Sequence, residues 1–235
     1  MRKSLFILSF VLLIGGLAVL LYPHIQQRLY ARHAASVIAD FETRLETYRA
    51  ESDDGTLRAL HEKIIAYNNN LYLTGQDRFV DPFSYEQVDF SLRYFGFEEE
   101  MIGSIYVPRM NITLPIFLGA SQYNLNRGAA HLTQTSLPIG GENTNAVIAA
   151  HRGMGTAAMF RDIERLEVGD RIRITNFYET IEYVVTETKI IVPTQVYTVL
   201  IQSGRDLLTL ITCHPYRFNH QRYLVFAERM DVENG

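Results

Sequence analysis

The strongest constraint on the fold is an unbroken apolar run over residues 5–22. Its length is close to the ~20 residues that a membrane-spanning helix needs. Because Arg2 and Lys3 precede the run, the positive-inside rule predicts an N-terminus inside the cell and the remainder outside. A cleaved signal peptide is the main alternative, but the run is long for a signal core and no clear small-x-small cleavage site comes before Pro23. We therefore predict a retained membrane anchor over residues 1–24.

Residues 25–74 are predicted to be helical, because apolar residues recur there at three- and four-residue steps with charged residues between them. The apolar positions are Ile38, Phe41, Leu45 and Tyr48 in the first half, and Leu57, Leu60, Ile64 and Leu71 in the second. The segment Ser52-Asp53-Asp54-Gly55 breaks the pattern. We predict two amphipathic helices that pack on the rest of the chain as a stalk.

A polar and turn-rich segment, residues 75–90, follows the helices. At its centre Asp81 precedes Pro82 and Phe83, and a residue before proline favours an extended or turn conformation. An ordinary connecting loop is the default interpretation, although an exposed Phe83 ring must be buried somewhere.

From Ile102 onwards the sequence is typical of short β-strands. The predicted strands are Ser104–Val107, Ile112–Leu118, Ala146–His151, Arg171–Thr175, Thr180–Val192, Leu207–Cys213 and Tyr223–Met230. A short helix is predicted over Met159–Leu166, and residues 176–179 are predicted to be a hairpin turn. Many strands with short connections favour a closed barrel or a sandwich. Residues 91–235 are therefore predicted to form one mainly β domain.

The only cysteine, Cys213, lies where the apolar strand over residues 207–212 ends. Arg222 begins the next apolar strand, so antiparallel pairing would bring the thiol and the guanidinium together at one end of a sheet. The positive charge would favour a thiolate and could stabilise an oxyanion. A small buried core cysteine is the commoner fate of a free thiol, and these two residues alone do not decide between the interpretations. A single cysteine excludes an intramolecular disulfide.

A nucleophilic cysteine needs a partner for proton transfer, and seven histidines compete for that role. The poor candidates, in the anchor-proximal and helical regions, are His24, His33 and His61. His214 is adjacent to Cys213, so its side chain should point to the opposite face of an extended strand. His131 and His220 stay open. His151 ends an apolar strand, where barrels often carry site residues. Sequence spacing alone favours His151 only slightly over the other open histidines.

Several segments together resemble the sortases, a family of cysteine transpeptidases. Thr209-Leu210-Ile211-Thr212-Cys213 matches the family's TLxTC signature, Arg222 follows nine residues later, and Ala150-His151-Arg152-Gly153 matches the histidine motif. The segments that also resemble sortases are Gly128–His131, Thr135–Pro138 and Leu166–Asp170, in which His131 matches a non-catalytic position. Asp81-Pro82-Phe83 resembles the lid of class C, pilus-building sortases. The resemblance spans about residues 79–230, and several spaced motifs are far more specific than one.

The resemblance implies an eight-stranded sortase β-barrel with short helices, behind the two N-terminal helices and the membrane helix. It implies that Cys213 attacks the Thr–Gly bond of an LPxTG-like sorting signal, that Arg222 holds the oxyanion, and that His151 moves the protons. It calls for no metal or other cofactor. In the pilus class the acyl acceptor is typically a lysine of the next pilin. The implied partners are pilin or surface-protein substrates, and the implied location is a Gram-positive-type cell surface.

Three functions stay open. The first is a pilin-polymerising sortase, and the second is a sortase that attaches surface proteins to peptidoglycan. The third is a non-catalytic membrane protein that only binds sorting signals, and an intact set of Cys213, His151 and Arg222 argues against it. The segment at residues 81–83 favours the first over the second by analogy alone. Hydrolysis is a lesser variant, since water can resolve a thioester. The balance of 22 basic against 26 acidic residues argues against nucleic acid as a partner.

Overall fold

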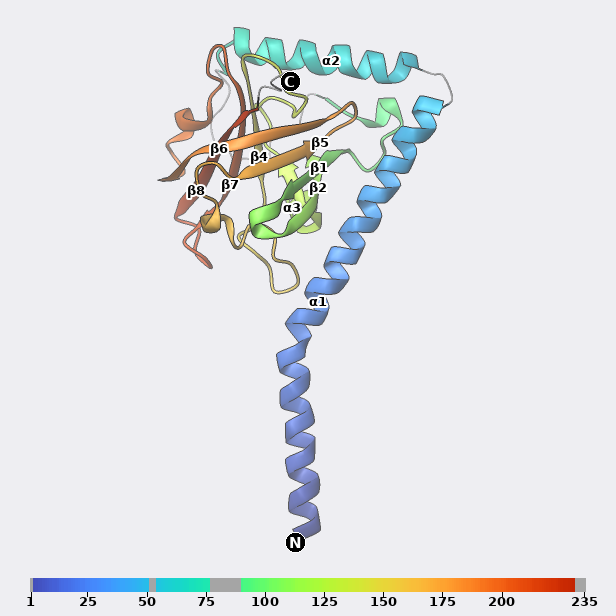
Figure 1. The fold of residues 1–235 in the computed structure, drawn as a ribbon, viewed down its shortest axis with the longest axis vertical. Coiled ribbons are helices and arrows are strands. Elements are labelled where there is room, and N and C mark those ends of the chain that lie inside the picture. Colours follow the sequence, from blue (N-terminus) through green and yellow to red (C-terminus); the bar gives the residue numbers. More distant parts are fainter. Residues whose placement is uncertain (1, 51–53, 77–89, 231–235) are drawn as a thin grey trace.

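The computed structural model describes residues 2–50, 54–76 and 90–230 of the chain (Figure 1). Within these ranges the α-helices are α1 (Arg2–Ala50), α2 (Asp54–Leu73) and α3 (Gln122–Arg127). The 3-10 helices are η1 (Arg93–Phe95), η2 (Pro108–Met110), η3 (Ile163–Arg165) and η4 (Val196–Val199). The strands are β1 (Met101–Val107), β2 (Ile112–Leu118), β3 (Ala129–His131), β4 (Thr144–Ala149), β5 (Arg171–Thr175), β6 (Thr180–Ile191), β7 (Asp206–His214) and β8 (Gln221–Arg229).

The eight strands close into a barrel in the order β1-β2-β3-β4-β7-β8-β6-β5. Two neighbouring pairs, β2 with β3 and β4 with β7, are parallel, and the remaining pairs are antiparallel. This confirms the predicted mainly β, eight-stranded barrel. Each of the seven predicted strands is present, with ends shifted by at most a few residues. The short β3 was not predicted, because three residues carry too little periodicity to be recognised.

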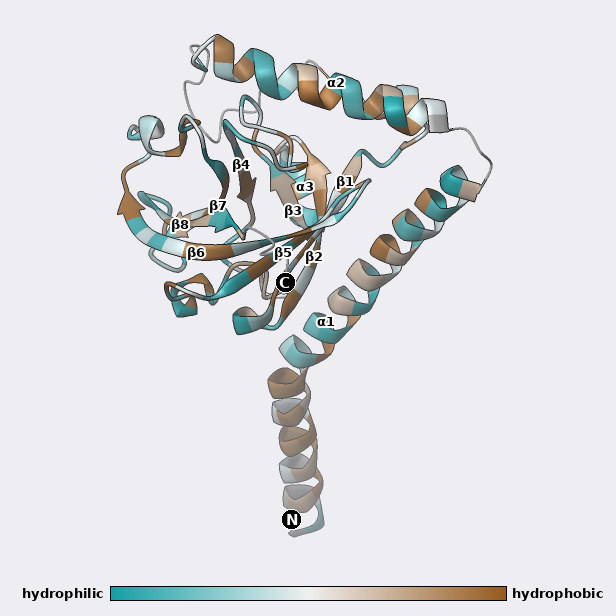
Figure 2. Cartoon of the chain, turned by 45° about the horizontal axis from the view of Figure 1, so that its top comes forward, coloured by the Kyte–Doolittle hydropathy of each residue, from teal (hydrophilic) through white to brown (hydrophobic). Residues whose placement is uncertain are grey.

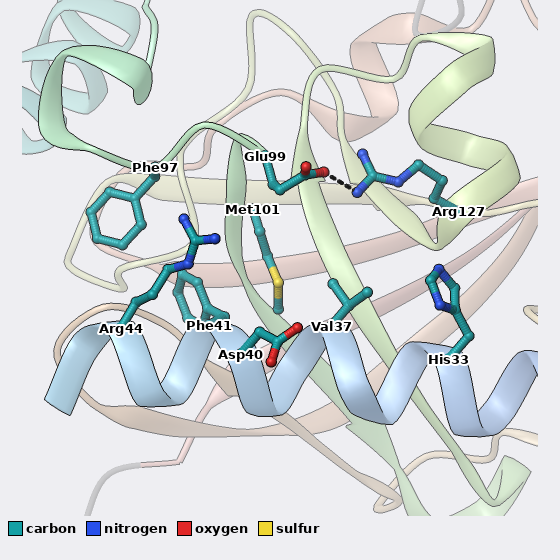
Figure 3. Close-up of a pocket in the computed structure, with 9 residues that line it drawn as sticks. All are labelled: His33, Val37, Asp40, Phe41, Arg44, Phe97, Glu99, Met101 and Arg127. Atoms are coloured by element: carbon teal, nitrogen blue, oxygen red, sulfur yellow. Dashed lines mark hydrogen bonds and ion pairs between the residues drawn. The ribbon is translucent and has the colours of Figure 1, made fainter. Parts of the chain in front are cut away.

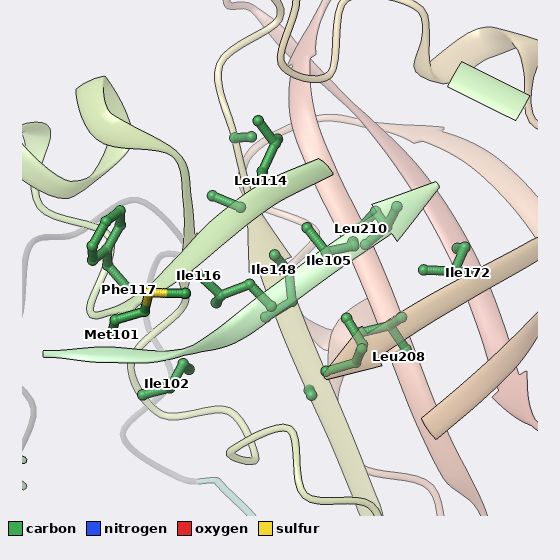
Figure 4. Packing of buried hydrophobic residues seen from close by; sticks show 14 of the residues in the cluster. Met101, Ile102, Ile105, Leu114, Ile116, Phe117, Ile148, Ile172, Leu208 and Leu210 are labelled. Carbon is green, nitrogen blue, oxygen red and sulfur yellow. The ribbon is translucent and has the colours of Figure 1, made fainter. Parts of the chain in front are cut away.

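The barrel is filled by alternate side chains of its strands. On β4, Ile148 points into the core with Ile105 of β1 and Leu210 of β7 (Figure 4). Its neighbours Val147 and Ala149 pack in a second buried cluster on the outer face of the wall. Successive strand residues point to opposite faces, and here both faces are covered. A strand covered on both faces is a continuous apolar run rather than an alternating one.

Helix α1 is one continuous α-helix through Pro23, so the predicted anchor and the first amphipathic helix are a single element (Figure 1). A proline inside a helix removes one hydrogen bond and bends the helix, but long helix-forming segments on both sides let the helix continue. The N-terminal half is apolar and exposed on all sides, whereas the other half is mixed (Figure 2). By length and composition, helix α1 is long and apolar enough to cross a membrane.

The C-terminal half of α1 packs along the outside of the barrel. Near the middle of α1, the Tyr30 hydroxyl donates to the Arg127 carbonyl at the end of α3 (2.9 Å). Near its end, Arg49 donates to the carbonyl of Phe177 in the β5–β6 turn (3.0 Å). Between these points Phe41 packs against Phe97 and Phe177, with ring centroids 6.0 and 5.4 Å apart. The helix is therefore fixed along its whole contact with the barrel.

Helix α2 lies across the end of the barrel where α1 ends (Figure 1). The Tyr178 hydroxyl of the β5–β6 turn donates to the Leu57 carbonyl (3.1 Å). The buried Asn68 side chain accepts from the Leu137 amide (2.8 Å) and donates to the Leu137 carbonyl (3.1 Å). Asn68 thus pairs with the backbone of Leu137 as a neighbouring strand would.

Two local expectations differ from the structure. The helix predicted over Met159–Leu166 is reduced to the single 3-10 turn η3, because residues before it form other turns. Strand β4 ends at Ala149, so His151 follows the strand instead of belonging to it.

Candidate active site

Cys213 and Arg222 face each other across the antiparallel pair β7–β8. They are direct register partners, as expected for two strands joined by a short loop. Cys213 is half-buried, and Arg222 is 9% exposed. The Arg222 Nη1 atom donates to the carbonyls of Asn219 (2.6 Å) and Gln221 (3.0 Å). These bonds anchor the guanidinium group to the loop that joins the two strands.

His151 lies beside this pair because β4 and β7 run parallel. Ala149 is the register partner of Ile211, and the Thr212 hydroxyl donates to the Ala150 carbonyl (2.7 Å). One residue beyond these partners come His151 on one chain segment and Cys213 on the other. The sequence-predicted residues Cys213, His151 and Arg222 therefore gather at the same end of three neighbouring strands.

The outer face of the barrel wall carries this site. Ile211 of β7 and Leu224 of β8 belong to the outer cluster with Val147 of β4. Because side chains alternate along a strand, Cys213 and Arg222 share the face of Ile211 and Leu224. The site is thus built on the outside of the wall, next to α3, whose Leu125 belongs to the same cluster.

Helix α3 contacts the His151 ring. The His151 Nε2 atom lies 3.3 Å from the Asn126 Oδ1 atom and 3.4 Å from the Gln122 Nε2 atom. A carbonyl oxygen can only accept, so the Asn126 contact favours a proton on Nε2, whereas the Gln122 amide nitrogen can only donate and favours an unprotonated Nε2. Helix α3 therefore offers a partner to either tautomer. Burial lowers the pKa of His151 below its usual 6.5, because the charged form loses solvation. The neutral imidazole is therefore the favoured form at neutral pH.

A charged cluster holds the end of β7 from its other face. Arg152 is 7% exposed; its Nη2 atom lies 2.7 Å from Glu164, and its Nη1 atom donates to the Cys213 carbonyl (3.4 Å). The His214 Nδ1 atom lies 3.0 Å from the same Glu164 oxygen. Hydrogen bonding and charge from Arg152, with a smaller contribution from His214, lower the pKa of the Glu164 carboxyl. His214 thus points away from Cys213, as strand alternation predicted.

His131 is fully buried, away from solvent, at the end of β3. Its Nε2 atom donates to the Thr135 carbonyl (3.0 Å), and its Nδ1 atom has no hydrogen-bond partner among the described residues. Burial lowers the pKa of His131 to about 4. A neutral, enclosed imidazole of this kind fits a structural role.

The remaining sequence-predicted features are the segment at residues 81–83, His220 and the expected absence of a metal. Asp81, Pro82 and Phe83 are outside the described residues. His220 is exposed in the β7–β8 loop, with its ring 6.0 Å from that of Phe218. The parts of the chain that the structure describes contain no group of His, Cys, Asp and Glu residues able to hold a metal ion.

A distinct cavity of about 250 Å³ lies between α1 and the barrel (Figure 3). Val37 and Phe41 of α1 face Met101 across it, and the Glu99–Arg127 ion pair closes one side. None of the three predicted site residues lines it. We interpret it as a packing gap in the seam between helix and barrel.

The sequence did not reveal the roles of Gln122, Asn126, Arg152 and Glu164 around the site. The signal for α3 is local: Ser121 caps the helix by accepting from the Asn124 amide. Serine followed by a polar helical turn is such a cap signal. No local signal pairs Arg152 with Glu164, because the contact depends on the course of the loop between them.

Comparison with known proteins identifies the family of the barrel. Residues 105–230, more than half of the 235-residue chain, match the family model described as a sortase domain. Sortase A of Bacillus anthracis is 30% identical over 131 residues, 56% of this chain and 60% of that relative. Sortase D of Bacillus subtilis is 28% identical over 131 residues, 54% of this chain and 63% of that relative. The match thus spans less than two thirds of the length of these two relatives.

Solved structures match over more of the chain. Sortase C-1 from Streptococcus pneumoniae superimposes with a TM-score of 0.73 at 35% identity, over 83% of this chain and 98% of that one. Sortase C1 of GBS Pilus Island 1 superimposes with a TM-score of 0.75 at 34% identity, over 84% of this chain and 98% of that one. The likeness includes the N-terminal helical region as well as the barrel, since the barrel alone is shorter than the matched part.

Proposed function

The chain belongs to the sortase family, and on that premise we propose that it is a cysteine transpeptidase that polymerises pilins. It cleaves an LPxTG-like sorting signal between Thr and Gly and transfers the acyl group to a lysine amine of another pilin. The observation that carries the proposal is the alignment of Cys213 with Arg222 across β7–β8, with His151 at the end of the parallel neighbour. The likeness to sortase C structures, one of them from a pilus island, supports the pilus role.

The roles follow from the chemistry of the three side chains. The Cys213 thiolate attacks the Thr carbonyl carbon, and the carbonyl oxygen becomes an oxyanion beside the Arg222 guanidinium. The C–N bond breaks as His151 gives its proton to the departing Gly amine, which leaves a Thr thioester. The incoming lysine amine then loses a proton to His151 and attacks the thioester, and Cys213 leaves as thiolate. No net oxidation occurs.

The catalytic form carries a thiolate and an imidazolium, so it is a minor form if His151 is mostly neutral at rest. Helix α3 positions the imidazole through Gln122 and Asn126. The Arg152–Glu164–His214 cluster positions the Cys213 backbone.

We also propose that the apolar half of α1 is a retained membrane anchor, with residues 1–24 as the anchor, 25–74 as the helical stalk, and 91–235 as the catalytic domain outside the cell. The exposure of the apolar side chains in the structure supports this division. The expectation that Asp81, Pro82 and Phe83 form a lid stays a prediction from the sequence.

Attachment of surface proteins to peptidoglycan is the alternative function. Its support is the match to sortase A sequences, such as that of Bacillus anthracis. We favour pilin polymerisation because the sortase C structures are more similar in sequence and match over more of the chain.

Incubation of the full chain with candidate pilins tests the proposal directly. Pilin polymerisation predicts covalent ladders on a denaturing gel, and a Cys213→Ala chain that keeps its fold should make none. Transfer only to a cell-wall amine, without ladders, would favour the alternative. Binding of the sorting signal without cleavage would contradict an enzymatic role.

A further inference from the structure

The barrel has a fixed orientation along α1. Near the middle of α1, Tyr30 bonds to the end of α3, the helix that contacts His151. Near the C-terminal end of α1, Arg49 bonds to Phe177 in the β5–β6 turn. The site end of the barrel therefore lies beside the part of α1 nearer the apolar half, and α2 lies at the opposite end (Figure 1).

The length of α1 sets the height of that end. The apolar run ends at Tyr22, eight residues before Tyr30, and the helix is continuous between them. A rise of 1.5 Å per residue makes this interval about 12 Å. The polar interface of a bilayer extends roughly 5–8 Å beyond its hydrocarbon core. If α1 crosses a membrane along its normal, the end of α3 beside Tyr30 lies roughly 4–7 Å above the lipid headgroups, and the β7–β8 loop is at the same end of the barrel.

This end of the barrel presents exposed aromatic side chains, which we call the site-end aromatics: Tyr123, Tyr216 and Phe218. Tyr123 on α3 is 67% exposed, and Phe218 in the β7–β8 loop is 62% exposed. Arginines stack on the two tyrosines: Arg127 lies 4.9 Å from the ring centroid of Tyr123, and Arg217 lies 5.5 Å from that of Tyr216.

Aromatic rings flanked by arginines have the chemistry of a lipid interface. Tyrosines concentrate at headgroup level in membrane proteins, with the ring toward the acyl chains and the hydroxyl in water. Arginine stems cover apolar surface while their charged ends reach headgroup phosphates; Arg217 has this arrangement beside Tyr216, whereas the Arg127 guanidinium is paired with Glu99. Single exposed aromatic residues are common on any protein, so the argument rests on the coincidence of these residues with the end of the barrel that α1 turns toward the membrane.

We infer that the end of the barrel carrying Cys213 rests on the lipid surface, with the site-end aromatics in the headgroup region. The inference rests on the anchor in the proposed function, and it adds a second contact with the membrane. It places the entrance to the site at the level of the headgroups. The loop between Cys213 and Arg222, residues 215–220, then contacts lipid directly.

Tryptophan fluorescence tests this contact, because the chain contains no tryptophan. Full-length Phe218→Trp, with Cys213→Ala to remove turnover, is reconstituted into phosphatidylcholine–phosphatidylglycerol vesicles with or without brominated acyl chains. Tyr123→Trp supplies a second reporter on a separate element. The matched control is Tyr94→Trp, since Tyr94 is 87% exposed in η1, which contacts α2, the helix at the opposite end of the barrel.

Lipid contact predicts that the Phe218→Trp and Tyr123→Trp reporters lose most of their emission to brominated lipid while the Tyr94→Trp control keeps its emission. Unquenched reporters in a chain that floats with the vesicles would overturn the lipid contact and leave the anchor intact. Equal quenching of all three would overturn the orientation. Reporters that lipid does not quench, but that added pilin shields from iodide, would assign the surface to a protein partner.

The outcome is independent of the catalytic proposal, since the reporters are read in an inactive chain. A chain that fails to float with the vesicles would overturn both the anchor and the lipid contact. Ladder formation by wild-type protein with unquenched reporters would leave the transpeptidase intact and remove only this inference.

Discussion

At the scale of single residues, substitution of Arg222 tests whether the site needs a directed hydrogen-bond donor or only a nearby positive charge. Arg222→Lys should lower kcat/KM for transpeptidation nearly as much as Arg222→Ala, by about 10²–10³-fold, the cost of removing one oxyanion-hole donor. Lysine keeps the charge but loses the planar fork. Steady-state rates with a sorting-signal peptide measure the effect. Near-normal turnover of the lysine variant would mean that a charge alone suffices.

His151 should titrate below pH 6.5, because its burial disfavours the charged form. NMR of carbon-labelled histidine can follow the ring, with His151→Ala to assign the signal. The pKa should stay below 6.5 in Cys213→Ala if burial is the cause. A value above 6.5 in wild type that falls on removal of Cys213 would instead show that a thiolate holds the proton on His151.

His131 should make stability dependent on pH. Its pKa is about 4 when folded and about 6.5 when unfolded. Between these values the unfolded state binds a proton that the folded state does not, so the free energy of unfolding falls as pH drops from about 6.5 toward about 4. The loss should approach roughly 3 kcal/mol.

Urea unfolding at several pH values measures the loss, with His131→Gln as the comparison. The variant is expected to be less stable at neutral pH but to lose less of its stability on acidification. An unchanged pH slope in His131→Gln would assign the acid sensitivity to other groups.

At the scale of elements, Asn68 joins α2 to the barrel. Asn68→Ala removes both hydrogen bonds to Leu137 and leaves its buried amide and carbonyl groups without these partners. Such losses cost about 1–3 kcal/mol each, so chemical denaturation should show a clear fall in stability. Asn69→Ala, one position along the exposed side of α2, is the control and should have little effect. Equal effects would contradict the role of Asn68.

The elements also show which parts of the fold the sequence could predict. Strands β7 and β8 were predictable together with the Cys213–Arg222 pair, because a short loop joins them and register follows. The position of His151 beside Cys213 depends on parallel pairing of β4 with β7, which are far apart in the sequence and share no local signal. The six residues of α3 carry too little periodicity to predict, although they contact His151. Pro23 lies inside α1, and the helix continues through it because helix-forming segments flank it on both sides.

At the scale of the whole molecule, the two halves of α1 should contribute differently to stability. A chain that starts at residue 25 keeps every described contact between α1 and the barrel, so its thermal midpoint should match that of the full chain. A chain that starts at residue 54 loses Phe41 and Leu45 and exposes Phe97 and Phe177. Burial of such side chains contributes several kcal/mol, so the midpoint should fall by about 10 °C.

Calorimetry of the two truncated chains measures the difference. Phe41→Ala in the chain that starts at residue 25 is the intermediate case, with an expected cost of about 3–5 kcal/mol. Equal midpoints for both truncations would mean that the barrel does not depend on α1.

The unbroken course of α1 between Tyr22 and Tyr30 has a geometric consequence. In a helix, the number of residues between the anchor and the barrel fixes both the height of the barrel above the membrane and its rotation about the helix axis. Each residue adds about 1.5 Å of height and about 100° of rotation. Seven residues inserted there would raise the barrel by about 10 Å and return it almost to its original rotation about the helix axis. Two would raise it by only about 3 Å yet swing it through about 200°, so that a different flank of the barrel overhangs the membrane near the anchor. The length of this helical segment therefore sets the height of the barrel and its rotation about the helix axis together, and neither can change without the other.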